Sequence, residues 1–384
     1  MPNTVQLGPY RPQLVEPERF ELLVEDGIIQ KVNLELGYVN RGIEKLFTTK
    51  TYEQNLALAE RICGICSGVH TLCYSQTVED IMGIDVPPRA RYLRTIYMEL
   101  ERLHSHYLWF GVLMHSLQDH SAFAKIMGER EQIQDLMEYL TGNRLNYAIN
   151  TLGGVRRDVQ DKKAAKIREV LVSMKALSGH ILSLLESNCT ITEKTEGVGV
   201  LLKTRAMSVG AVGPTARASG IRADIRVDDP YAAYGELDFD VITDDAGDTH
   251  AKALVRARET LESIGIVRQA LSSLPEGEIL GKTPSPRAKE AIGRVEAPRG
   301  ELFYYISSNG SNVPNRVKVR TPSFANNLAV VEMLKGEKLD NARTVIESID
   351  PCFACTDRVA VVDLTAKKRR WLVINQEASS WLGR

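Results

Sequence analysis

Two Cys-x-x-Cys pairs lie near opposite ends of the sequence, Cys63 with Cys66 and Cys352 with Cys355. In or beside a helix, two sulfur atoms three residues apart point to the same side, so each pair can offer two ligands to one ion. Soft thiolates favour zinc, iron–sulfur clusters, copper or nickel over hard cations. One pair alone would fit a zinc knuckle or a thiol redox site equally well, whereas two pairs favour a single site with four thiolates.

The long separation of the two pairs argues against a small structural zinc module, in which about 15–20 residues normally lie between them. Here residues 67–351 intervene, so a shared site would lie deep in the fold and join both ends of the chain. His70 follows Cys66 by four residues and would share its helix face, where it could donate an N–H to a sulfur. Asp350 precedes a proline, which favours an extended or turn approach to the second pair.

The composition excludes several classes of protein. The chain has 384 residues, of which 43% are hydrophobic and 25% charged, and its net charge is −1. These are ordinary globular values, and the balanced charge argues against a nucleic-acid partner. No apolar run approaches the roughly 18–20 residues that span a bilayer, and residues 1–6 do not resemble a signal peptide. We therefore expect a cytoplasmic location.

The elements that must position the cysteines follow from the hydrophobic pattern, which predicts a mostly helical α+β fold with small peripheral sheets. Alternating runs around turns predict hairpins at 20–34 and 302–319, and a strand is predicted at 359–364. Helices are predicted over 51–82 with a break near Cys63, and over 87–118, 129–149, 160–188, 250–273, 324–335 and 338–348.

The two cysteine motifs, Arg61–His70 (RICGICSGVH) and Asp350–Arg358 (DPCFACTDR), resemble the N- and C-terminal signatures of nickel–iron hydrogenase large subunits. Their order, their positions and all four thiols match, and the resemblance covers essentially the whole chain. Glu16–Phe20 (EPERF), Gly37–Leu46 (GYVNRGIEKL) and Glu99–His106 (ELERLHSH) resemble the membrane-bound, energy-converting group 4 enzymes, relatives of the 49-kDa subunit of respiratory complex I. The complex I branch has lost the nickel-binding cysteines, whereas this chain keeps all four.

The resemblance implies a core bundle of long helices with small peripheral hairpins, within a single large-subunit domain over 1–384. The expected regions are an N-terminal β region (1–50), a helical core with the first cysteine pair (51–190), an irregular subdomain (190–250), a helical and β region with the second pair (251–358) and a tail (359–384). The tail is either a maturation extension, cleaved after Arg358, or a permanent strand as in the complex I branch.

The resemblance also implies a nickel–iron centre whose iron carries carbon monoxide and cyanide. Cys63 and Cys352 would be terminal nickel ligands, while Cys66 and Cys355 would bridge nickel to iron. No iron–sulfur cluster is expected within this chain.

Further residues would surround this centre. Arg299, in the segment APRG, would overhang the metals, because a fixed cationic fork can bind cyanide nitrogens and polarise hydrogen in a dry pocket. Pro322 and Ser323 would line the diatomic ligands, with the Ser323 hydroxyl donating to cyanide. His70 and Asp350 would support the ligands from behind.

A carboxylate relay would carry the proton away from the centre. Glu16 resembles the glutamate that the family uses to accept the proton from the cysteine here numbered Cys352. A buried carboxyl beside a metal–thiolate can have its pKa raised toward the working pH. Glu18 and Glu21 are close rivals, because one sequence does not fix the register.

One departure from better-known hydrogenases concerns a second, structural metal. There a histidine three residues after the last cysteine helps to hold that metal together with the glutamate matching Glu44. In this chain the position is Arg358, which cannot ligate a metal. The sequence therefore predicts an ion pair between Glu44 and Arg358 in place of the metal.

The implied function is reversible cleavage of hydrogen by the catalytic subunit of a membrane-bound hydrogenase, peripheral on the cytoplasmic side of the membrane. The implied partners are an iron–sulfur small subunit, membrane subunits that translocate ions, and ferredoxin reached through electron-transfer subunits. An alternative is a redox-coupling or quinone-site subunit of the complex I type without hydrogenase activity. A tetrathiolate zinc scaffold is a third interpretation, but it leaves the Arg299 and Ser323 segments unexplained.

Overall fold

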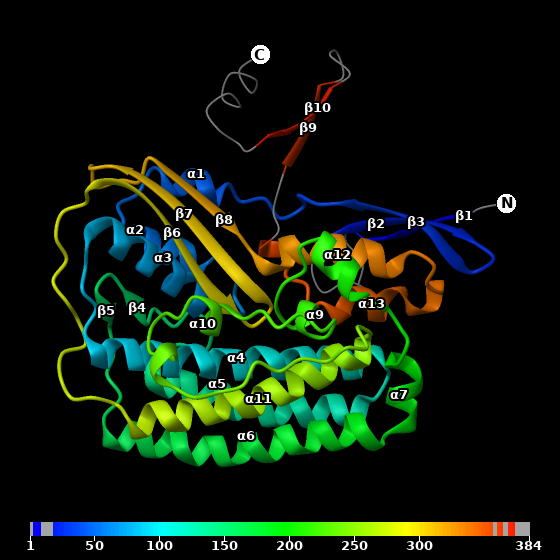
Figure 1. Cartoon of the computed structure of the whole chain (residues 1–384), viewed down its shortest axis with the longest axis horizontal. Coiled ribbons are helices and arrows are strands. Elements are labelled where there is room, and N and C mark those ends of the chain that lie inside the picture. The colour runs from blue at the N-terminus through cyan, green and yellow to red at the C-terminus, as the bar shows by residue number, and fades with distance from the viewer. Residues whose placement is uncertain (1–2, 9–17, 356–358, 364–367, 373–384) are drawn as a thin grey trace.

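The computed structural model describes residues 3–8, 18–355, 359–363 and 368–372. Within them the fold is α+β and mostly helical, which confirms the predicted fold class. A bundle of long helices forms one half of the molecule, and small sheets with shorter helices form the other (Figure 1). None of the described helices combines the length and the apolar character that a membrane crossing requires.

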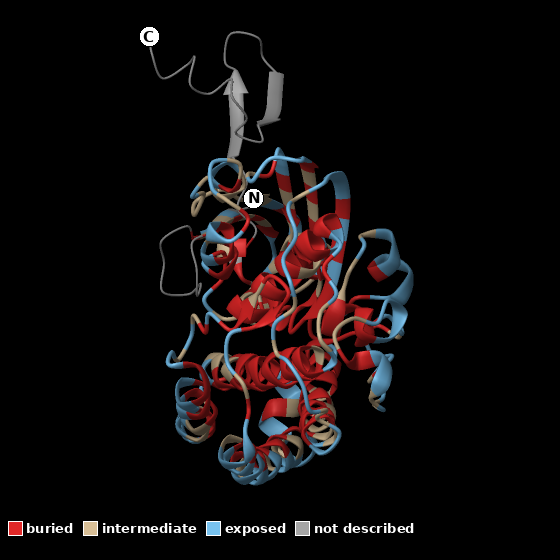
Figure 2. Cartoon of the chain, turned by 90° about the vertical axis from the view of Figure 1, so that its left-hand side faces the viewer, coloured by how far each residue is buried: buried red, intermediate tan, exposed pale blue. Residues whose placement is uncertain are grey.

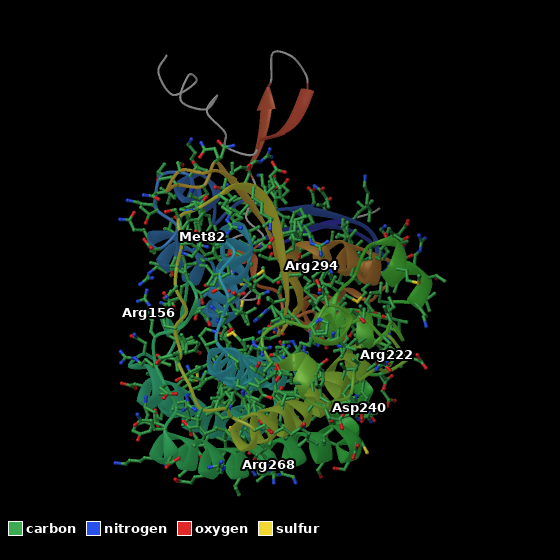
Figure 3. The ribbon with its side chains drawn as sticks, turned by 60° about the vertical axis from the view of Figure 1, so that its left-hand side comes forward. Met82, Arg156, Arg222, Asp240, Arg268 and Arg294 are labelled. Atoms are coloured by element: carbon green, nitrogen blue, oxygen red, sulfur yellow. The ribbon has the colours of Figure 1, made fainter. Side chains whose placement is uncertain are left out.

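Four long helices make up the bundle: α4 (Pro88–Ser116), α5 (His120–Thr141), α6 (Asp161–Ser187) and α11 (Thr249–Ser272). Helix α4 packs against both α5 and α11, so it lies at the centre (Figure 1), and it is buried along most of its length. Figure 2 shows the buried residues gathered in the interior and the exposed ones on the outside. Proline fits the first turn of α4 because that turn needs no intrahelical N–H. Charged side chains such as Arg268 and Arg222 are exposed at the periphery (Figure 3).

A three-stranded antiparallel sheet covers helix α3 (Ser67–Met82). Its order is β6 (Ala288–Ala297), β7 (Gly300–Asn309) and β8 (Arg316–Arg320). The helix approaches the sheet so closely that a Cβ atom on Gly293 would lie 2.1 Å from the Thr77 hydroxyl. This packing buries alternate residues of β7 toward α3.

A second apolar cluster lies between the N-terminal sheet and two later helices. The sheet has the order β1 (Asn3–Leu7), β2 (Arg19–Glu25) and β3 (Ile28–Glu35), and α12 (Pro322–Leu334) and α13 (Ala342–Ser348) pack nearby. The remaining elements are α1 (Ile43–Phe47), α2 (Gln54–Glu60), β4 (Asn150–Thr151), β5 (Gly154–Val155), α7 (Cys189–Thr195), α8 (Lys203–Ser208), α9 (Gly213–Arg217), α10 (Ile225–Asp228), β9 (Val359–Asp363), β10 (Lys368–Leu372) and three short 3₁₀ turns.

Most predicted elements are present, but one predicted helix has different bounds and one strand was not predicted. The helix predicted at 129–149 runs from His120 to Thr141, because Asp119 caps its N-terminus by accepting from Ala122 N and Gly142 ends it with φ 91°. Strand β6 is absent from the predicted elements, since its alanine, glycine and charged residues have low β-propensity. The division of the chain into regions stays a prediction.

Candidate metal centre

The four thiols of the two Cys-x-x-Cys pairs meet in the interior. The sulfur atoms of Cys63 and Cys352 are 3.3 Å apart, and those of Cys352 and Cys355 are 2.9 Å apart. The sulfurs of Cys63, Cys66 and Cys355 all lie within 4.8 Å of one another. Because sulfur atoms bind zinc at about 2.3 Å, four sulfurs this close can share one small metal site.

The first pair lies in the turn between α2 and α3, where backbone N–H groups point at sulfur. The amides of Ile65 and Cys66 donate to the Cys63 sulfur at 3.3 and 3.4 Å. The neighbouring thiols of Cys352 and Cys355 lower the pKa of Cys63 well below its ordinary value, and the Arg299 charge adds to this effect. Cys63 is thereby prepared to bind a metal as a thiolate.

The second pair lies in the turn that follows α13, and helix α12 holds it. The Cys352 amide donates to the Ser323 hydroxyl oxygen at 3.0 Å, and the Thr321 hydroxyl donates to the Cys355 carbonyl at 2.8 Å. Pro322 is the first residue of α12. Ser323 therefore contacts the cysteine loop directly, while its proposed bond to a diatomic ligand stays a prediction.

His70 connects the sulfur cluster to the sheet. Its Nε2 lies 3.8 Å from the Cys355 sulfur, and its Nδ1 lies 2.9 Å from the Tyr304 hydroxyl. Burial lowers the pKa of His70 to about 4, so the ring is neutral near pH 7 and can donate one N–H. Sequence reasoning missed Tyr304, although its inward position in the alternating strand β7 was a signal.

Arg299 lies buried beside the cluster in a fixed orientation. Its Nε donates to the Asp350 carbonyl and its Nη2 to the Asp350 carboxylate, both at 2.7 Å, and Nη1 donates to the Ser105 hydroxyl at 3.1 Å. Burial alone would lower the pKa of Arg299, but Asp350 and the cysteine sulfurs hold this pKa above its ordinary value. Asp350 has a left-handed φ of 56°, so the proline that follows it is approached through a turn.

Comparison with known proteins identifies the family. A model of nickel-dependent hydrogenases matches residues 41–166, and a model of the 49-kDa subunit of respiratory-chain NADH dehydrogenase matches residues 117–288 and 279–358. The chain belongs to this hydrogenase and complex I family. The family resemblance inferred from the cysteine motifs is thus confirmed.

Individual members of the family match over nearly the whole chain. The carbon monoxide-induced hydrogenase of Rhodospirillum rubrum is 38% identical over 357 residues, which cover 92% of this chain and 99% of that protein. The membrane-bound hydrogenase subunit alpha of Pyrococcus furiosus is 37% identical, with coverages of 93% and 88%. A subunit of the NADH-quinone oxidoreductase of Dehalococcoides mccartyi is 35% identical, with coverages of 92% and 98%.

The donor set of this family member suits a nickel–iron centre. Four buried sulfurs from both ends of the chain supply the soft ligands that nickel and iron prefer, and a neutral imidazole and a cation lie beside them. The same sulfurs could hold zinc, so the donor set alone does not select the metal.

Glu101 supports the first cysteine pair from helix α4. Its two carboxylate oxygens accept from the amides of Gly68 and Val69 at 2.6 and 2.9 Å, at the start of the helix that follows Cys66. A Cβ on Gly68 would lie 2.9 Å from one of these oxygens, which explains the glycine. Burial raises the pKa of Glu101 to about 8, although the two amides oppose this shift.

Helix α4 also carries the centre of a buried ionic cluster. The Glu99 carboxylate accepts from Tyr234 at 2.6 Å, from Ser263 at 2.7 Å, and from Arg102 and Arg226 at 3.2 Å. Arg102 also donates to the carbonyls of residues 296 and 297, just before Arg299. The other members of the cluster are Asp224, Arg217, Glu259, Glu296 and His106. The cluster therefore fixes the strand end that leads to Arg299.

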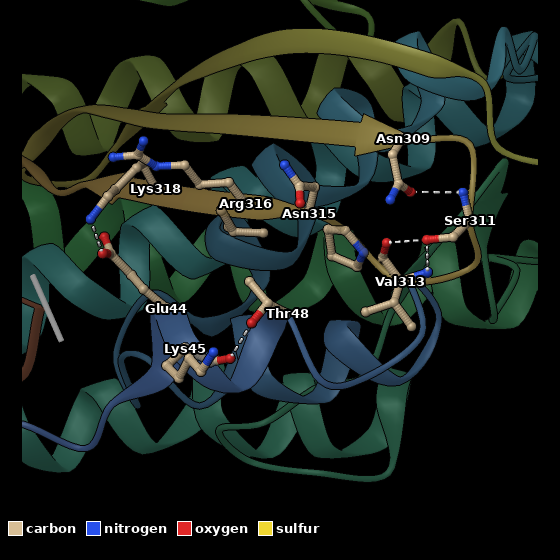
Figure 4. Close-up of a pocket in the computed structure, with 11 residues that line it drawn as sticks. Glu44, Lys45, Thr48, Asn309, Ser311, Val313, Asn315, Arg316 and Lys318 are labelled. Carbon is tan, nitrogen blue, oxygen red and sulfur yellow. Dashed lines mark hydrogen bonds and ion pairs between the residues drawn. The ribbon is translucent and has the colours of Figure 1, made fainter. Parts of the chain in front are cut away.

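The predicted ion pair of Glu44 with Arg358 stays a prediction, because Arg358 lies outside the described residues. Glu44 lines a polar pocket of about 450 Å³ between α1 and the β7–β8 hairpin (Figure 4). There its carboxylate accepts from Lys318 Nζ at 2.6 Å and from Val319 N at 3.1 Å. Glu44 thus already forms an ion pair with Lys318.

The proton-relay glutamate likewise stays a prediction. Glu16 lies outside the described residues. Of its two rivals, Glu18 is fully buried, whereas Glu21 is half-buried on strand β2.

Proposed function

We propose that this chain is the catalytic subunit of a membrane-bound nickel–iron hydrogenase, which interconverts hydrogen with protons and electrons. The observation that carries the proposal is the meeting of four buried cysteine sulfurs from both ends of the chain. The identity to two hydrogenases over nearly the whole chain supports it.

Cys63, Cys66, Cys352 and Cys355 would hold the nickel and iron, each as a thiolate ligand. The iron would carry carbon monoxide and cyanide. When bound, this group would supply the oxidation of H₂, which begins with heterolytic cleavage and over the complete reaction releases two protons and two electrons. The burial of all four sulfurs excludes water from the site and strengthens every electrostatic interaction within it.

The surrounding side chains would then orient, polarise and move protons. Arg299, held by Asp350 and Ser105, would present a fixed cation to cyanide nitrogens and to hydrogen. Pro322, Ser323 and His70 would also line the metal site. Glu16 would accept the proton leaving Cys352, and the burial of Glu18 makes it the stronger rival.

We further propose that the chain works within a complex that lies on the cytoplasmic side of a membrane. The name of the Pyrococcus furiosus relative describes a subunit of a membrane-bound hydrogenase. An iron–sulfur small subunit would carry electrons, ferredoxin would exchange them through further subunits, and membrane subunits would translocate ions.

A complex I-type subunit without hydrogenase activity is the second candidate, favoured by the 49-kDa family match and by the relative from Dehalococcoides mccartyi. Nickel analysis of the complex purified with its partners distinguishes the two. We expect about one nickel per chain and hydrogen-dependent reduction of a viologen dye. A complex that contains no nickel and reduces no dye would support the complex I-type alternative.

Cleavage of the tail after Arg358 stays a proposal. Among the described residues, β9 pairs with β10, and Figure 1 shows this hairpin away from the bundle and the sheets. The intact mass of the active subunit would reveal whether residues 359–384 are removed.

A further inference from the structure

The Arg41 guanidinium contacts the backbone on either side of the sulfur cluster. Its Nη1 donates to the Arg61 carbonyl at 2.6 Å, and its Nη2 donates to the carbonyls of Ile62 at 2.8 Å and Ala354 at 3.1 Å. The first two acceptors precede Cys63 directly, and the third lies directly before Cys355. One planar side chain thus joins the loop of the first cysteine pair to the loop of the second.

A tight turn directs Arg41 toward these carbonyls. The Asn40 side-chain oxygen accepts from the Gly42 amide at 2.8 Å, and Gly42 adopts a left-handed φ of 63° before the first residue of α1. The amides of Lys45 and Leu46 donate to the Gly42 carbonyl, so the turn is continuous with the helix. The backbone around Arg41 is therefore held in place by hydrogen bonds that do not involve its side chain.

The three acceptors require the fork of an arginine. Guanidinium presents several N–H donors in one rigid plane, whereas a lysine ammonium is a point charge on a flexible stem. Hydrogen bonds from a charged donor are also stronger than those from a neutral one.

We infer that Arg41 is a positioning residue of the metal centre: its fork fastens the loop of Cys63 to the loop of Cys355, so that the sulfurs are aligned for metal binding. Arg41 itself does not contact the reacting atoms. This inference rests on the proposed function, because that function supplies the metal which the aligned sulfurs would bind. The alignment itself can be measured without any metal.

The first test uses the metal-free chain. Diamide oxidises two thiols to a disulfide, and its own diazene takes up the two electrons and two protons. Mass spectrometry of tryptic peptides then measures the rate of cross-linking between the first cysteine pair and the second. We expect R41K and R41Q to slow this rate by about tenfold or more, the effect of one lost charged hydrogen bond.

R89Q is the control, because the buried Arg89, like the exposed Arg41, joins two distant loops through its guanidinium. It donates to the carbonyls of Pro275 at 2.8 Å and Val159 at 3.1 Å, far along the chain from both cysteine pairs. This variant should lose stability without a slower cross-link. If R41K cross-links at the wild-type rate, the fork does not align the sulfurs and the inference is wrong.

A second test separates alignment from general misfolding. The variant R41A should regain faster cross-linking when methylguanidinium is added, and R89A should not change its cross-linking rate under the same conditions. In the complex purified with its partners, R41K should also lower nickel per chain and shift the g values of the nickel electron paramagnetic resonance signal. Absence of both rescue and spectral shift would overturn the inference, whereas a complex that never contains nickel would overturn only the proposed function.

Discussion

Helices α4 and α6 lie in one bundle and have 29 and 27 residues, but only α4 buries a group of charged side chains beside its apolar ones. The buried face of α6 is almost entirely apolar and includes Ile167, Leu171, Met174 and Ile181. The middle of α4 buries charged and polar groups that contact Arg299, the start of α3 or one another within the ionic cluster, namely Glu99, Glu101, Arg102, Ser105 and His106.

The difference between α4 and α6 suggests that one helix mainly stabilises the bundle while the other mainly supports the candidate site. Burying a charge is costly unless partners surround it, whereas an apolar face stabilises the bundle simply by leaving water. On α4, Glu99 and Arg102 are paired with each other and with further polar groups, Arg102 leads to the strand end before Arg299, and Glu101 holds the start of α3. We therefore expect α6 to hold the fold and α4 to hold the site.

The largest effect is expected where the site itself is broken. Cys352→Ser removes a sulfur that lies within 3.3 Å of two others and should abolish both nickel binding and hydrogen-dependent dye reduction. Nickel analysis and the dye assay measure this, with Cys189→Ser, an exposed cysteine away from the cluster, as the control. Nickel retained at the wild-type level in Cys352→Ser would contradict the assignment of this ligand.

A smaller but still severe effect is expected for Glu99→Gln, because it leaves Arg102 and Arg226 buried without their shared carboxylate. The free energy of unfolding should fall by about 3–5 kcal/mol, as for other broken buried ion pairs. Denaturant titration measures the loss. A change within about 0.5 kcal/mol would mean that the cluster does not stabilise the folded state.

A comparable or somewhat smaller loss is expected for Met174→Ala on α6, about 2–4 kcal/mol from the cavity it leaves. Unlike changes on α4, this variant should keep full nickel content and activity per folded molecule. Loss of nickel from the folded Met174→Ala complex would erase the distinction between the two helices.

The pH dependence of stability should differ between the same two variants. Burial alone would raise the pKa of Glu99, but Arg102 and Arg226 lower it to about 2, below its value of 4.5 in the unfolded chain. The unfolded state therefore binds the extra proton between those values, so stability is lost as pH falls from about 4.5 toward 2, by about 1.4 kcal/mol per pH unit. Glu99→Gln should flatten this slope, whereas Met174→Ala should keep it.

The smallest effect on the free energy of unfolding is expected for a change at the periphery, outside both helices. Glu44→Gln weakens a partly exposed pair with Lys318 and should cost about 0–1 kcal/mol if no other cation matters. A loss of several kcal/mol would instead indicate the ion pair with Arg358 that the sequence predicts.

The sequence alone predicted the fold class, most long elements and the four cysteines that meet at the centre, because helix periodicity is local and the cysteine motifs are specific. It did not predict contacts that depend on how distant segments pack. Tyr304 reaches His70 only because β7 covers α3, and Arg41 reaches Ala354 only after both ends of the chain have folded. The sequence pattern did not predict strand β6, because its pairing with β7, and not its composition, holds it in place.

The meeting of the first and last thirds of the chain has a consequence for biosynthesis. While the ribosome is still making the middle of the chain, only Cys63 and Cys66 are available, and two thiols form a weaker and less selective site than four. The complete set of sulfurs exists only after Cys355 has left the ribosome. Binding of a metal by all four sulfurs would therefore follow the synthesis of nearly the whole chain, at a time when the helices that shield the site have already been made.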